Sequence, residues 1–200
     1  MDNLADYKLS IDPLKSFIGW YDAASICEQN PTAMTLSTYD VKLNRPDART
    51  VLFKGMEDGK LIFYTNYKSA KGLEIEKNNE VCLLFYWHES KRQVRIHGRA
   101  QKMSEEKSAQ YFQSRDRESQ LASWTSQQSQ PIESKESLEK KLQETTLKFK
   151  NADIPLPMSW GGYLIDPYEF EFFVYGDYRL NDRFLFQQNN KEWAITRLQP

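Results

Sequence analysis

Three side chains that could hold an anion recur at every fourth position of the stretch YFQSRDRESQ, residues 111–120. If the stretch is helical, Tyr111, Arg115 and Ser119 project from one face, because residues four apart are neighbours on a helix surface. The guanidinium offers a fixed fork of donors that matches a phosphate, while the phenol and the hydroxyl add neutral donors. The alternative is a solvated helix face that carries a half-buried tyrosine. The stretch by itself is compatible with both.

A second candidate anion site lies in YTNYKSAKG, residues 64–72, where a strand-like run passes into a helical one. Thr65 and Ser69 supply hydroxyl groups, and Lys68 and Lys71 supply positive charge. Backbone N–H groups at a helix N-terminus, helped by a lysine, form a natural seat for a phosphate.

Charged residues inside strand-like runs give further candidates, because a charge in a sheet either faces water or requires a partner. Arg49 and Lys54 are five positions apart, so strict alternation places them on opposite faces of a strand. A shared ligand would then require a bulge, a strand end or a ligand that spans the edge of the sheet. Two exposed cations are the alternative.

Near the C-terminus, the sequence RLNDR places Arg179, Asn181 and Arg183 at alternate positions. In an extended segment these three side chains would share one face. Two guanidiniums on one face repel each other unless an anion or a carboxylate lies between them. Asp177 or Asp182 could supply that carboxylate, and a bound anionic ligand is the other possibility.

The overall composition excludes several classes of function. The 27 Lys and Arg against 28 Asp and Glu give a net charge of -1. The chain therefore lacks the excess of positive charge that is typical of proteins that bind nucleic acids or membranes in general. His88 and His97 are the only histidines and lack a second ligand at metal-binding spacing, so no metal is expected. Cys27 and Cys82 form no CxxC pattern, and no apolar run is long enough for a signal peptide or a membrane span. We therefore expect a soluble, cytoplasmic protein.

The hydrophobic periodicity predicts one helix, then strands, then helices, then strands. Residues 12–29 carry apolar side chains at helical spacing, with Asp12 as cap and Pro13 at the first position. Runs rich in β-branched and aromatic residues, separated by turn residues, predict strands over residues 32–40, 49–55, 60–66, 80–87, 92–100, 168–175, 183–187 and 192–198. Helix-forming runs cover residues 104–115, 117–127 and 134–150.

This order of elements predicts an α+β fold. The first five strands, with MEDGK (56–60) as a hairpin loop, favour an antiparallel meander that closes or nearly closes into a barrel. After the helices and a Pro/Gly-rich connector, the last strands would complete the barrel. A chain of this length buries roughly 70% of its unfolded surface, enough for one core. We expect a single domain over residues 12–200, preceded by a flexible N-terminal extension of residues 1–11.

The polar stretches come in an order and at a spacing that resemble the pyridoxine (pyridoxamine) 5′-phosphate oxidases, flavin enzymes that make pyridoxal 5′-phosphate. The similarity covers roughly residues 12–200 and rests on RTVLFK, FYTNYKSAKG, LLFYWHESKRQV, YFQSRDRESQLASWTSQQS, PLPMSWGGY and EFFVYGDYRLNDRFLF. It implies an antiparallel, Greek-key-like split β-barrel that forms a homodimer, with FMN bound in two clefts at the interface. It also implies oxidation of pyridoxamine 5′-phosphate or pyridoxine 5′-phosphate to pyridoxal 5′-phosphate, with O2 reduced to H2O2.

The resemblance assigns roles to individual residues of this sequence. The positions implied for FMN are Arg49, Thr50, Val51, Leu52, Lys54, Tyr64, Thr65, Lys71, Gln93, Gln128, Ser129, Phe173 and Arg183. The positions implied for the substrate are Lys54, Tyr111, Arg115, Ser119, Arg179 and Asn181. Within the second set, Tyr111, Arg115 and Ser119 would hold the substrate phosphate. Arg179 and Asn181 would be the catalytic pair, with Arg179 covering the substrate ring.

Three residues depart from the family pattern. Asn181 replaces a histidine, and an amide cannot become a cation near neutral pH, so slower turnover or weaker substrate binding is expected. Ala70 replaces an arginine at the flavin-phosphate seat. One lost charge-assisted hydrogen bond is worth about 1.5–3 kcal/mol, so FMN would bind roughly tenfold or more weakly unless Lys68 compensates. Phe173 replaces a tryptophan, which keeps the stacking surface but loses the indole N–H.

Two other functions share many of these features. The flavin oxidases of phenazine biosynthesis have the same fold and FMN site but act on a tricyclic substrate without a phosphate, and the retained Tyr111, Arg115 and Ser119 argue against that substrate. A non-catalytic split-barrel protein that binds FMN or pyridoxal 5′-phosphate as a carrier or sensor would account for Asn181 and Ala70.

Overall fold

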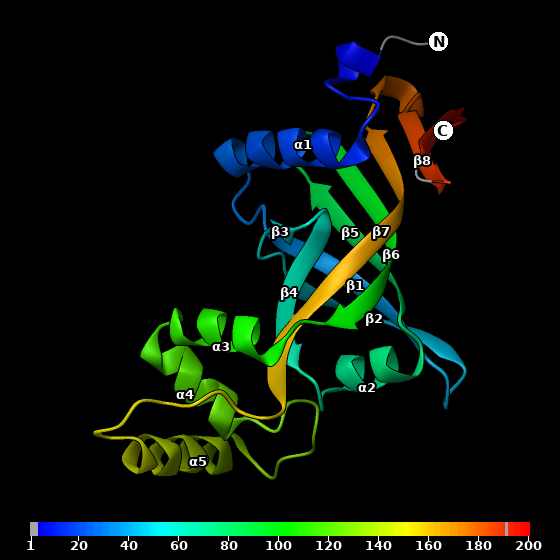
Figure 1. The fold of residues 1–200 in the computed structure, drawn as a ribbon. Helices are drawn as coiled ribbons and strands as arrows, with labels where there is room; N and C mark the ends of the chain where they lie inside the picture. Colours follow the sequence, from blue (N-terminus) through cyan, green and yellow to red (C-terminus); the bar gives the residue numbers. More distant parts are fainter. Residues whose placement is uncertain (1–3, 191) are drawn as a thin grey trace.

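Nine strands and five α-helices make up the part of the chain that the computed structural model describes, residues 4–190 and 192–200 (Figure 1). The strands are β1 (Ala33–Asp40), β2 (Arg45–Leu52), β3 (Met56–Glu57), β4 (Lys60–Asn66), β5 (Glu80–Trp87), β6 (Arg92–Lys102), β7 (Trp160–Val174), β8 (Asp182–Asn189) and β9 (Glu192–Leu198). The helices are α1 (Pro13–Cys27), α2 (Ala70–Lys77), α3 (Glu105–Gln113), α4 (Arg117–Thr125) and α5 (Lys135–Lys148), and the 3-10 turns are η1 (Leu4–Tyr7) and η2 (Asp177–Arg179). Within the described ranges, no helix combines the length and the apolar character needed to cross a membrane.

Side chains cap the N-termini of the helices, and the cap predicted at Asp12 is confirmed. The carboxylate of Asp12 accepts a hydrogen bond from the backbone N–H of Leu14, and Pro13 occupies the first helical position of α1. Ser69 caps α2 and Ser104 caps α3 in the same way. The expected helices over residues 12–29, 104–115, 117–127 and 134–150 are confirmed, with ends that differ by at most two residues.

The strands form a single antiparallel sheet in the order β2-β1-β5-β6-β7-β4-β3, with β8 paired to β7 and β9 paired to β8. The α+β prediction is confirmed, but the simple meander of the first five strands is wrong. β4 pairs with β7, and β5 pairs with β1. The reason is α2, which lies between β4 and β5 and carries the chain away from the edge of β4 before β5 begins. The predicted hairpin loop is confirmed, because Asp58 and Gly59 turn the chain from β3 into β4 with φ of 48° and 77°.

β7 begins eight residues before the strand that the sequence predicts, inside the expected connector. Gly161 and Gly162 look like chain breakers in the sequence, yet both lie in the strand and pair with β4. A Cβ at Gly161 would lie 2.2 Å from the hydroxyl of Tyr67, and one at Gly162 would lie 2.9 Å from the ring of Tyr64. These glycines are therefore required by close side-chain approach and do not end the strand.

The main core is dominated by aromatic side chains on one side of the sheet, where α1 covers it. Phe17 and Trp20 of α1 are fully buried and pack against Phe85 of β5 and Phe172 of β7. The segment ahead of α1 also contacts this core, since Leu9 is buried and the Trp20 indole donates to the Tyr7 carbonyl at 3.0 Å. Residues 1–3 of the predicted N-terminal extension lie outside the described ranges, and the boundary at residue 12 stays a prediction.

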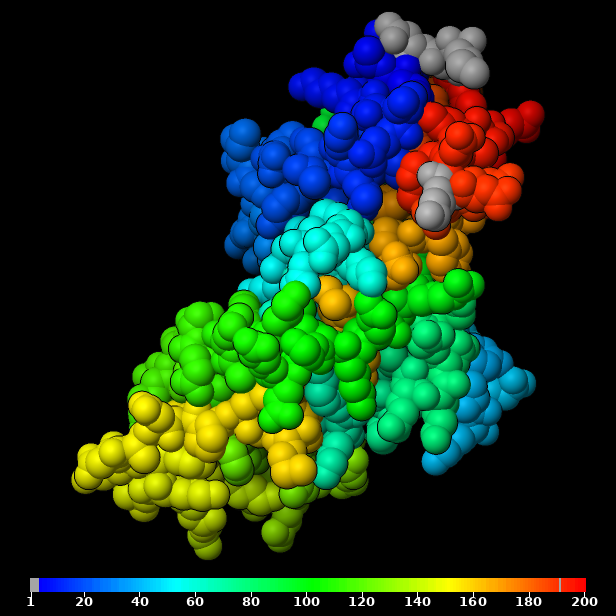
Figure 2. All heavy atoms as spheres, viewed as in Figure 1, coloured from blue at the N-terminus to red at the C-terminus, as the bar shows by residue number. Residues whose placement is uncertain are grey.

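A second, smaller core lies beneath α3, α4 and α5. It contains Phe112, Leu121, Phe149, Ile154 and Trp160. In Figure 2, the helical segment forms a lobe at the lower left, away from α1 and the C-terminal strands at the top. Trp160 opens β7, so it joins this lobe to the sheet and fixes the helices against the strand ends of β4 and β7.

Candidate active site

A polar cavity of about 550 Å³ lies where the ends of β2 and β4 meet α3, α4 and the start of β7. Its lining residues are Thr50, Val51, Leu52, Lys54, Tyr64, Thr65, Lys71, Tyr111, Ser114, Arg115, Asp116, Ser119, Gln128 and Trp160. All but Ser114, Asp116 and Trp160 are among the site residues implied by the sequence resemblance. The structure thus places both candidate anion seats, at Lys71 and at Arg115, in one cavity.

One wall of the cavity is a stack of three parallel aromatic rings. The rings of Tyr64 and Tyr111 lie 3.8 Å apart between centroids with planes 9° apart, and the Trp160 ring lies 5.3 Å from Tyr64 and 6.3 Å from Tyr111, nearly parallel to both. Burial and the neighbouring Tyr111 raise the pKa of Tyr64 to about 12, so its phenol stays neutral and able to donate at physiological pH. The stack gives the site a rigid, flat surface.

The three residues of the opening motif line the cavity, but they do not lie on one helix. Tyr111 belongs to α3, which ends at Gln113, and Ser119 belongs to α4, which begins at Arg117. Arg115 lies in the link between the two helices. The single-helix expectation is wrong because Asp116 caps α4 and starts a new helix in the middle of the motif. The link still points the three side chains into one space.

The guanidinium of Arg115 is held before any ligand arrives. Its Nη1 donates to the hydroxyl of Ser123 at 2.8 Å, and its Cζ lies 4.8 Å from the centroid of the Trp160 ring. Burial lowers the pKa of Arg115, but an arginine stays protonated at any physiological pH. The site therefore presents a half-buried, oriented cation.

Asp116 brings a negative charge to the same seat. Its Oδ1 accepts the backbone N–H of Ser119 at 2.7 Å, and its Oδ2 accepts the Ser119 hydroxyl at 3.0 Å. These two hydrogen bonds, with the nearby Arg115, hold the pKa of Asp116 below its usual range, although the carboxylate is exposed. The carboxylate is therefore ionised at neutral pH.

Lys71 forms the cation of the second seat, at the first turn of α2. Its side chain is buried, with its Nζ 3.5 Å from the Ser69 hydroxyl. Burial and the nearby Arg49 lower the pKa of Lys71, while Glu74 and Asp47 act in the opposite direction. A buried lysine in the first turn of a helix suits an incoming phosphate, because the helix N-terminus also favours negative charge.

A partly buried ion network lies next to Lys71. Arg49 contacts Asp47 at 2.6 Å and Glu74 at 2.9 Å through its Nη2, and its Nη1 donates to Thr38. Thr38 in turn donates to the Glu74 carboxylate, which is 8% exposed. The guanidinium of Arg49 is thus committed to protein carboxylates and does not line the cavity. The neighbouring Thr50, Val51 and Leu52 do.

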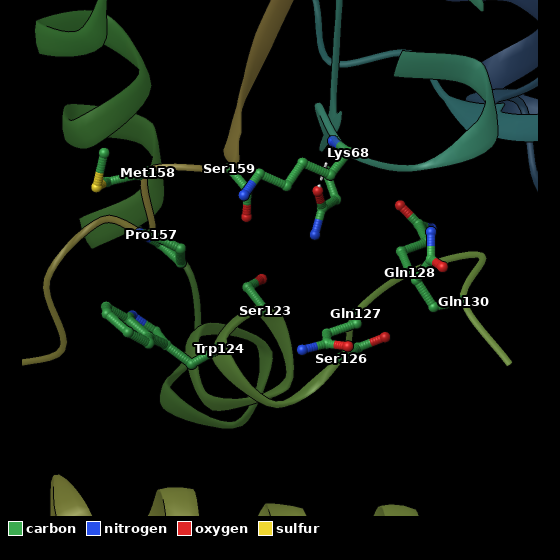
Figure 3. A pocket seen from close by; sticks show the side chains of 11 residues that line it. Lys68, Ser123, Trp124, Ser126, Gln127, Gln128, Gln130, Pro157, Met158 and Ser159 are labelled. Atoms are coloured by element: carbon green, nitrogen blue, oxygen red, sulfur yellow. Dashed lines mark hydrogen bonds between the residues drawn. The ribbon is translucent and has the colours of Figure 1, made fainter. Parts of the chain in front are cut away.

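A second pocket of about 440 Å³ adjoins this cavity and shares Gln128 with it. Figure 3 shows Ser123 and Gln127 facing Lys68 and Ser159 across it. Lys68 belongs to this pocket and is not a lining residue of the cavity that holds Lys71, so it does not stand in for the missing side chain at Ala70 in that cavity. Ser129 lies in the exposed turn after Gln128, with φ of 70°, and lines neither space.

The remaining predicted site residues gather at the opposite end of β7. Gln93, Phe173 and Arg183 are direct neighbours across β6, β7 and β8. Arg183 donates from Nε to the buried carboxylate of Glu171 at 2.8 Å, and Glu171 also binds Arg95. Glu171 therefore supplies the negative charge expected beside Arg183.

The turn before β8 differs from the extended segment that the alternation predicts. Arg179 lies in the 3-10 turn η2 with φ of 65°, and its neighbour Tyr178 has φ of 54°. The Asn181 side chain accepts the backbone N–H of Gly176 at 3.1 Å and closes this turn. Arg179 and Arg183 consequently do not share a strand face. Asp182 binds Arg197 and is not the partner of either.

The two groups of predicted residues do not meet within one chain. Gly161, beside the cavity, and Phe173, beside Arg183, are twelve residues apart on β7, or about 40 Å at 3.3 Å per residue. Figure 1 shows the same separation, with α3 and α4 at one end of β7 and β8 at the other. A site that uses both groups requires a second copy of the chain.

Of the cavity residues that sequence reasoning missed, Asp116 and Trp160 contribute most. Asp116 could have been found from the sequence, because it lies directly before the helix expected over residues 117–127 and aspartate is a preferred N-cap residue. Trp160 gave no signal apart from the SWGG stretch, which looked like a connector. Among the described residues, no group of histidine, cysteine, aspartate and glutamate could hold a metal ion.

Family models cover most of the chain. A model described as Pyridoxamine 5'-phosphate oxidase matches residues 23–149, and one described as Pyridoxine 5'-phosphate oxidase C-terminal dimerisation region matches residues 160–200. The Pyridoxine/pyridoxamine 5'-phosphate oxidase of Rubrobacter xylanophilus is 43% identical over 98% of this chain and 91% of its own length. The protein of the same name from Legionella pneumophila is 44% identical over 98% of this chain and 92% of its own length.

Solved structures show the same architecture. PhzG from Burkholderia lata, crystallised with tetrahydrophenazine-1-carboxylic acid, superposes with a TM-score of 0.90 at 26% identity, covering 96% of this chain and 95% of PhzG. A pyridoxamine 5'-phosphate oxidase-related, FMN-binding protein from Nostoc punctiforme gives a TM-score of 0.76 at 19% identity, covering 96% of this chain and 100% of its own. The second likeness concerns the fold alone.

Proposed function

The chain belongs to the pyridoxamine 5′-phosphate oxidase family, and on that basis we propose that it oxidises pyridoxamine 5′-phosphate and pyridoxine 5′-phosphate to pyridoxal 5′-phosphate. The cofactor is FMN, and O2 is reduced to H2O2. The observation that carries this function is the presence of two phosphate seats in one cavity, one at Lys71 and one at Arg115. Two phosphorylated ligands, a cofactor and a substrate, require two such seats.

The residues around Lys71 fit the phosphate end of FMN. Lys71 is buried with a lowered pKa, and Lys54 adds a second cation to the same cavity. A phosphate there would restore the charge balance that burial of Lys71 disturbs. We assign Thr50, Val51, Leu52, Tyr64, Thr65 and Gln128 to the same ligand, with Arg49 orienting the β2 segment through Glu74. Ser129, in the turn after Gln128 and outside the cavity lining, stays a predicted FMN contact.

The substrate phosphate is assigned to Tyr111, Arg115 and Ser119, with Lys54 between the two seats. Arg115 supplies an oriented guanidinium, and the Tyr64–Tyr111–Trp160 stack closes the pocket wall behind it. Bound FMN supplies the acceptor for the hydride that leaves the C4′ carbon of the substrate. The contribution of the protein is to hold the two ligands in a reactive alignment by their phosphates.

A homodimer completes the site. The C-terminal dimerisation region spans β7, β8 and β9, which carry Phe173, Arg179, Asn181 and Arg183. We assign Gln93, Phe173 and Arg183 of one copy to the flavin bound in the cavity of the other copy. Arg179 and Asn181 of the first copy are assigned to the substrate ring in that same cavity. Asn181 acts there chiefly by closing the turn that presents Arg179, since its side chain is bonded to Gly176.

Oxidation of a phenazine precursor is the second candidate, favoured by the TM-score of 0.90 with PhzG. The identity to that protein is 26%, against 43% and 44% to the B6-vitamer oxidases. A tricyclic substrate without a phosphate would leave Arg115 half-buried beside Trp160 with no anion to bind. The phosphate seat therefore favours the phosphorylated vitamers.

The test is an anaerobic titration of the FMN-loaded protein with pyridoxamine 5′-phosphate, followed through the absorbance of oxidised flavin. Bleaching that returns on admitting air, with pyridoxal 5′-phosphate and peroxide as products, supports the oxidase. Flavin that binds but bleaches with neither the amine nor the alcohol would leave the fold in place and favour a carrier of FMN or pyridoxal 5′-phosphate.

We also propose residues 12–200 as one domain and the cytoplasm as the compartment, in keeping with two free cysteines, Cys27 and Cys82.

A further inference from the structure

We propose that Asp116 sets the affinity of the substrate-phosphate seat. Its carboxylate competes with the phosphate for the hydrogen-bond donors of Ser119, and its negative charge repels the phosphate. This inference rests on the proposed role of the Arg115 seat. Asp116 lies in the same cavity as Arg115 and Ser119, at the start of α4. Its effect is to keep the affinity for phosphate below the value that the cationic and hydroxyl donors alone would give.

The competition follows from the number of protons that Ser119 can donate. A serine has one hydroxyl proton and one backbone N–H. The hydroxyl donates to Oδ2 of Asp116 at 3.0 Å and the N–H donates to Oδ1 at 2.7 Å, so both donors are engaged. A phosphate can accept from the Ser119 hydroxyl only after that hydroxyl has left Asp116. Binding therefore exchanges one charge-assisted hydrogen bond for another, with a small net gain.

The second component is charge. Asp116 is ionised at neutral pH, because its hydrogen bonds with Ser119 favour the charged form. It partly neutralises the adjacent Arg115 and repels an anion in the seat. The carboxylate is exposed to solvent, so the repulsion is screened and its effect on affinity is moderate.

A helix cap alone does not require this charge. Asparagine caps a helix N-terminus as well as aspartate does, with its side-chain oxygen accepting the same N–H group. The substitution Asp116→Asn therefore keeps the start of α4, frees the hydroxyl of Ser119 and removes the negative charge. Asp12→Asn is the matched control, because Asp12 caps α1 through the N–H of Leu14 and lies outside the Arg115 cavity.

The experiment uses the FMN-loaded protein, so that the Lys71 seat is filled and inorganic phosphate reports on the Arg115 seat. Calorimetry gives the Kd of inorganic phosphate, and steady-state kinetics give its inhibition constant against pyridoxamine 5′-phosphate. We expect both constants to fall about three- to tenfold in Asp116→Asn and to stay unchanged in Asp12→Asn. The difference between the wild type and Asp116→Asn should shrink as NaCl is raised.

The two proposals can fail separately. The wild type could fail to oxidise the vitamer and still bind phosphate more weakly than Asp116→Asn does. That outcome supports this inference and contradicts the proposed reaction. Equal or weaker phosphate binding by Asp116→Asn, with an unchanged Tm, overturns the inference and leaves Asp116 as a helix cap. Absence of phosphate binding in both proteins overturns it as well.

Discussion

The guanidinium of Arg115 is fixed by the hydroxyl of Ser123, which accepts a hydrogen bond from Nη1 at 2.8 Å and donates to the carbonyl of Ser119 at 3.0 Å. Ser123 lines the adjoining pocket (Figure 3) and is not a lining residue of the cavity that holds Tyr111, Arg115 and Ser119. It therefore orients the cation without occupying the phosphate seat. A positioning residue of this kind should affect the binding of the phosphorylated substrate more than the turnover of bound substrate.

Substitution of Ser123 by alanine is expected to raise the KM for pyridoxamine 5′-phosphate about three- to tenfold, because the lost hydrogen bond that orients the guanidinium is worth about 0.5–1.5 kcal/mol. The value of kcat should change less than KM, because the reacting carbon is held elsewhere. Ser126→Ala removes an exposed hydroxyl from the adjoining pocket and serves as the control. A fall in kcat with constant KM would show that Ser123 does not act through Arg115.

The buried Lys71 should give FMN binding a distinctive pH dependence. The pKa of Lys71 lies below its ordinary value of 10.5, and only the protonated amine attracts the phosphate. FMN affinity should therefore be highest between about pH 6, where the phosphate becomes a dianion, and the lowered pKa of Lys71. It should decline as the pH rises through that pKa, before 10.5 is reached.

Lys71→Arg tests this assignment, because an arginine keeps its charge throughout the range. Titration of flavin fluorescence from neutral to alkaline pH should show an earlier decline in the wild type than in Lys71→Arg. Parallel declines in the two proteins would assign the alkaline loss to another group.

The Glu74 carboxylate should contribute to stability as well as to the site. It binds Arg49 and Thr38 in a buried network, and Glu74→Gln would leave the guanidinium of Arg49 with only part of its countercharge. We expect the free energy of unfolding to fall by about 1–3 kcal/mol in denaturant titrations at fixed protein concentration. Glu76→Gln, an exposed position on the same helix, should stay within about 0.5 kcal/mol of the wild type. Equal losses in the two variants would contradict a special role for the network.

Shared sites between two chains can be tested by complementation. Arg115→Ala removes the phosphate seat and Arg179→Ala removes the group presented from the far end of β7, so each variant alone should lose most of its activity. When the two are co-expressed in equal amounts, half of the dimers are mixed and each mixed dimer has one intact site. Activity should return to about a quarter of the wild-type value. If both arginines served the same chain's site, mixing would restore nothing.

The composition and periodicity of the sequence were sufficient for local structure. The start of α1 at Asp12 and Pro13 depends on neighbours in sequence, and these are fully visible in the one-letter code. The order of the strands was not accessible in the same way, because pairing of β4 with β7 joins segments about one hundred residues apart. Local sequence patterns do not indicate which distant strand a given strand will pair with.

The candidate site shows the same limit. The cavity residues came from long motifs, but the early start of β7 depends on Tyr67 and Tyr64 lying over Gly161 and Gly162, which no local rule expresses. The turn at Arg179 was misjudged for a different reason. Alternation describes an extended chain, whereas a left-handed φ at a residue other than glycine is fixed by its surroundings.

The length of β7 has a consequence for how activity depends on dilution. One strand carries a residue of the cavity at its start and a neighbour of Arg183 at its end, so, with the shared site proposed above, a lone chain would hold two incomplete halves. Below the dissociation constant of the dimer, the number of complete sites grows with the square of the chain concentration. A newly synthesised chain would accordingly remain inactive until it meets a second one, and scarcity of the protein would reduce its activity more steeply than its amount.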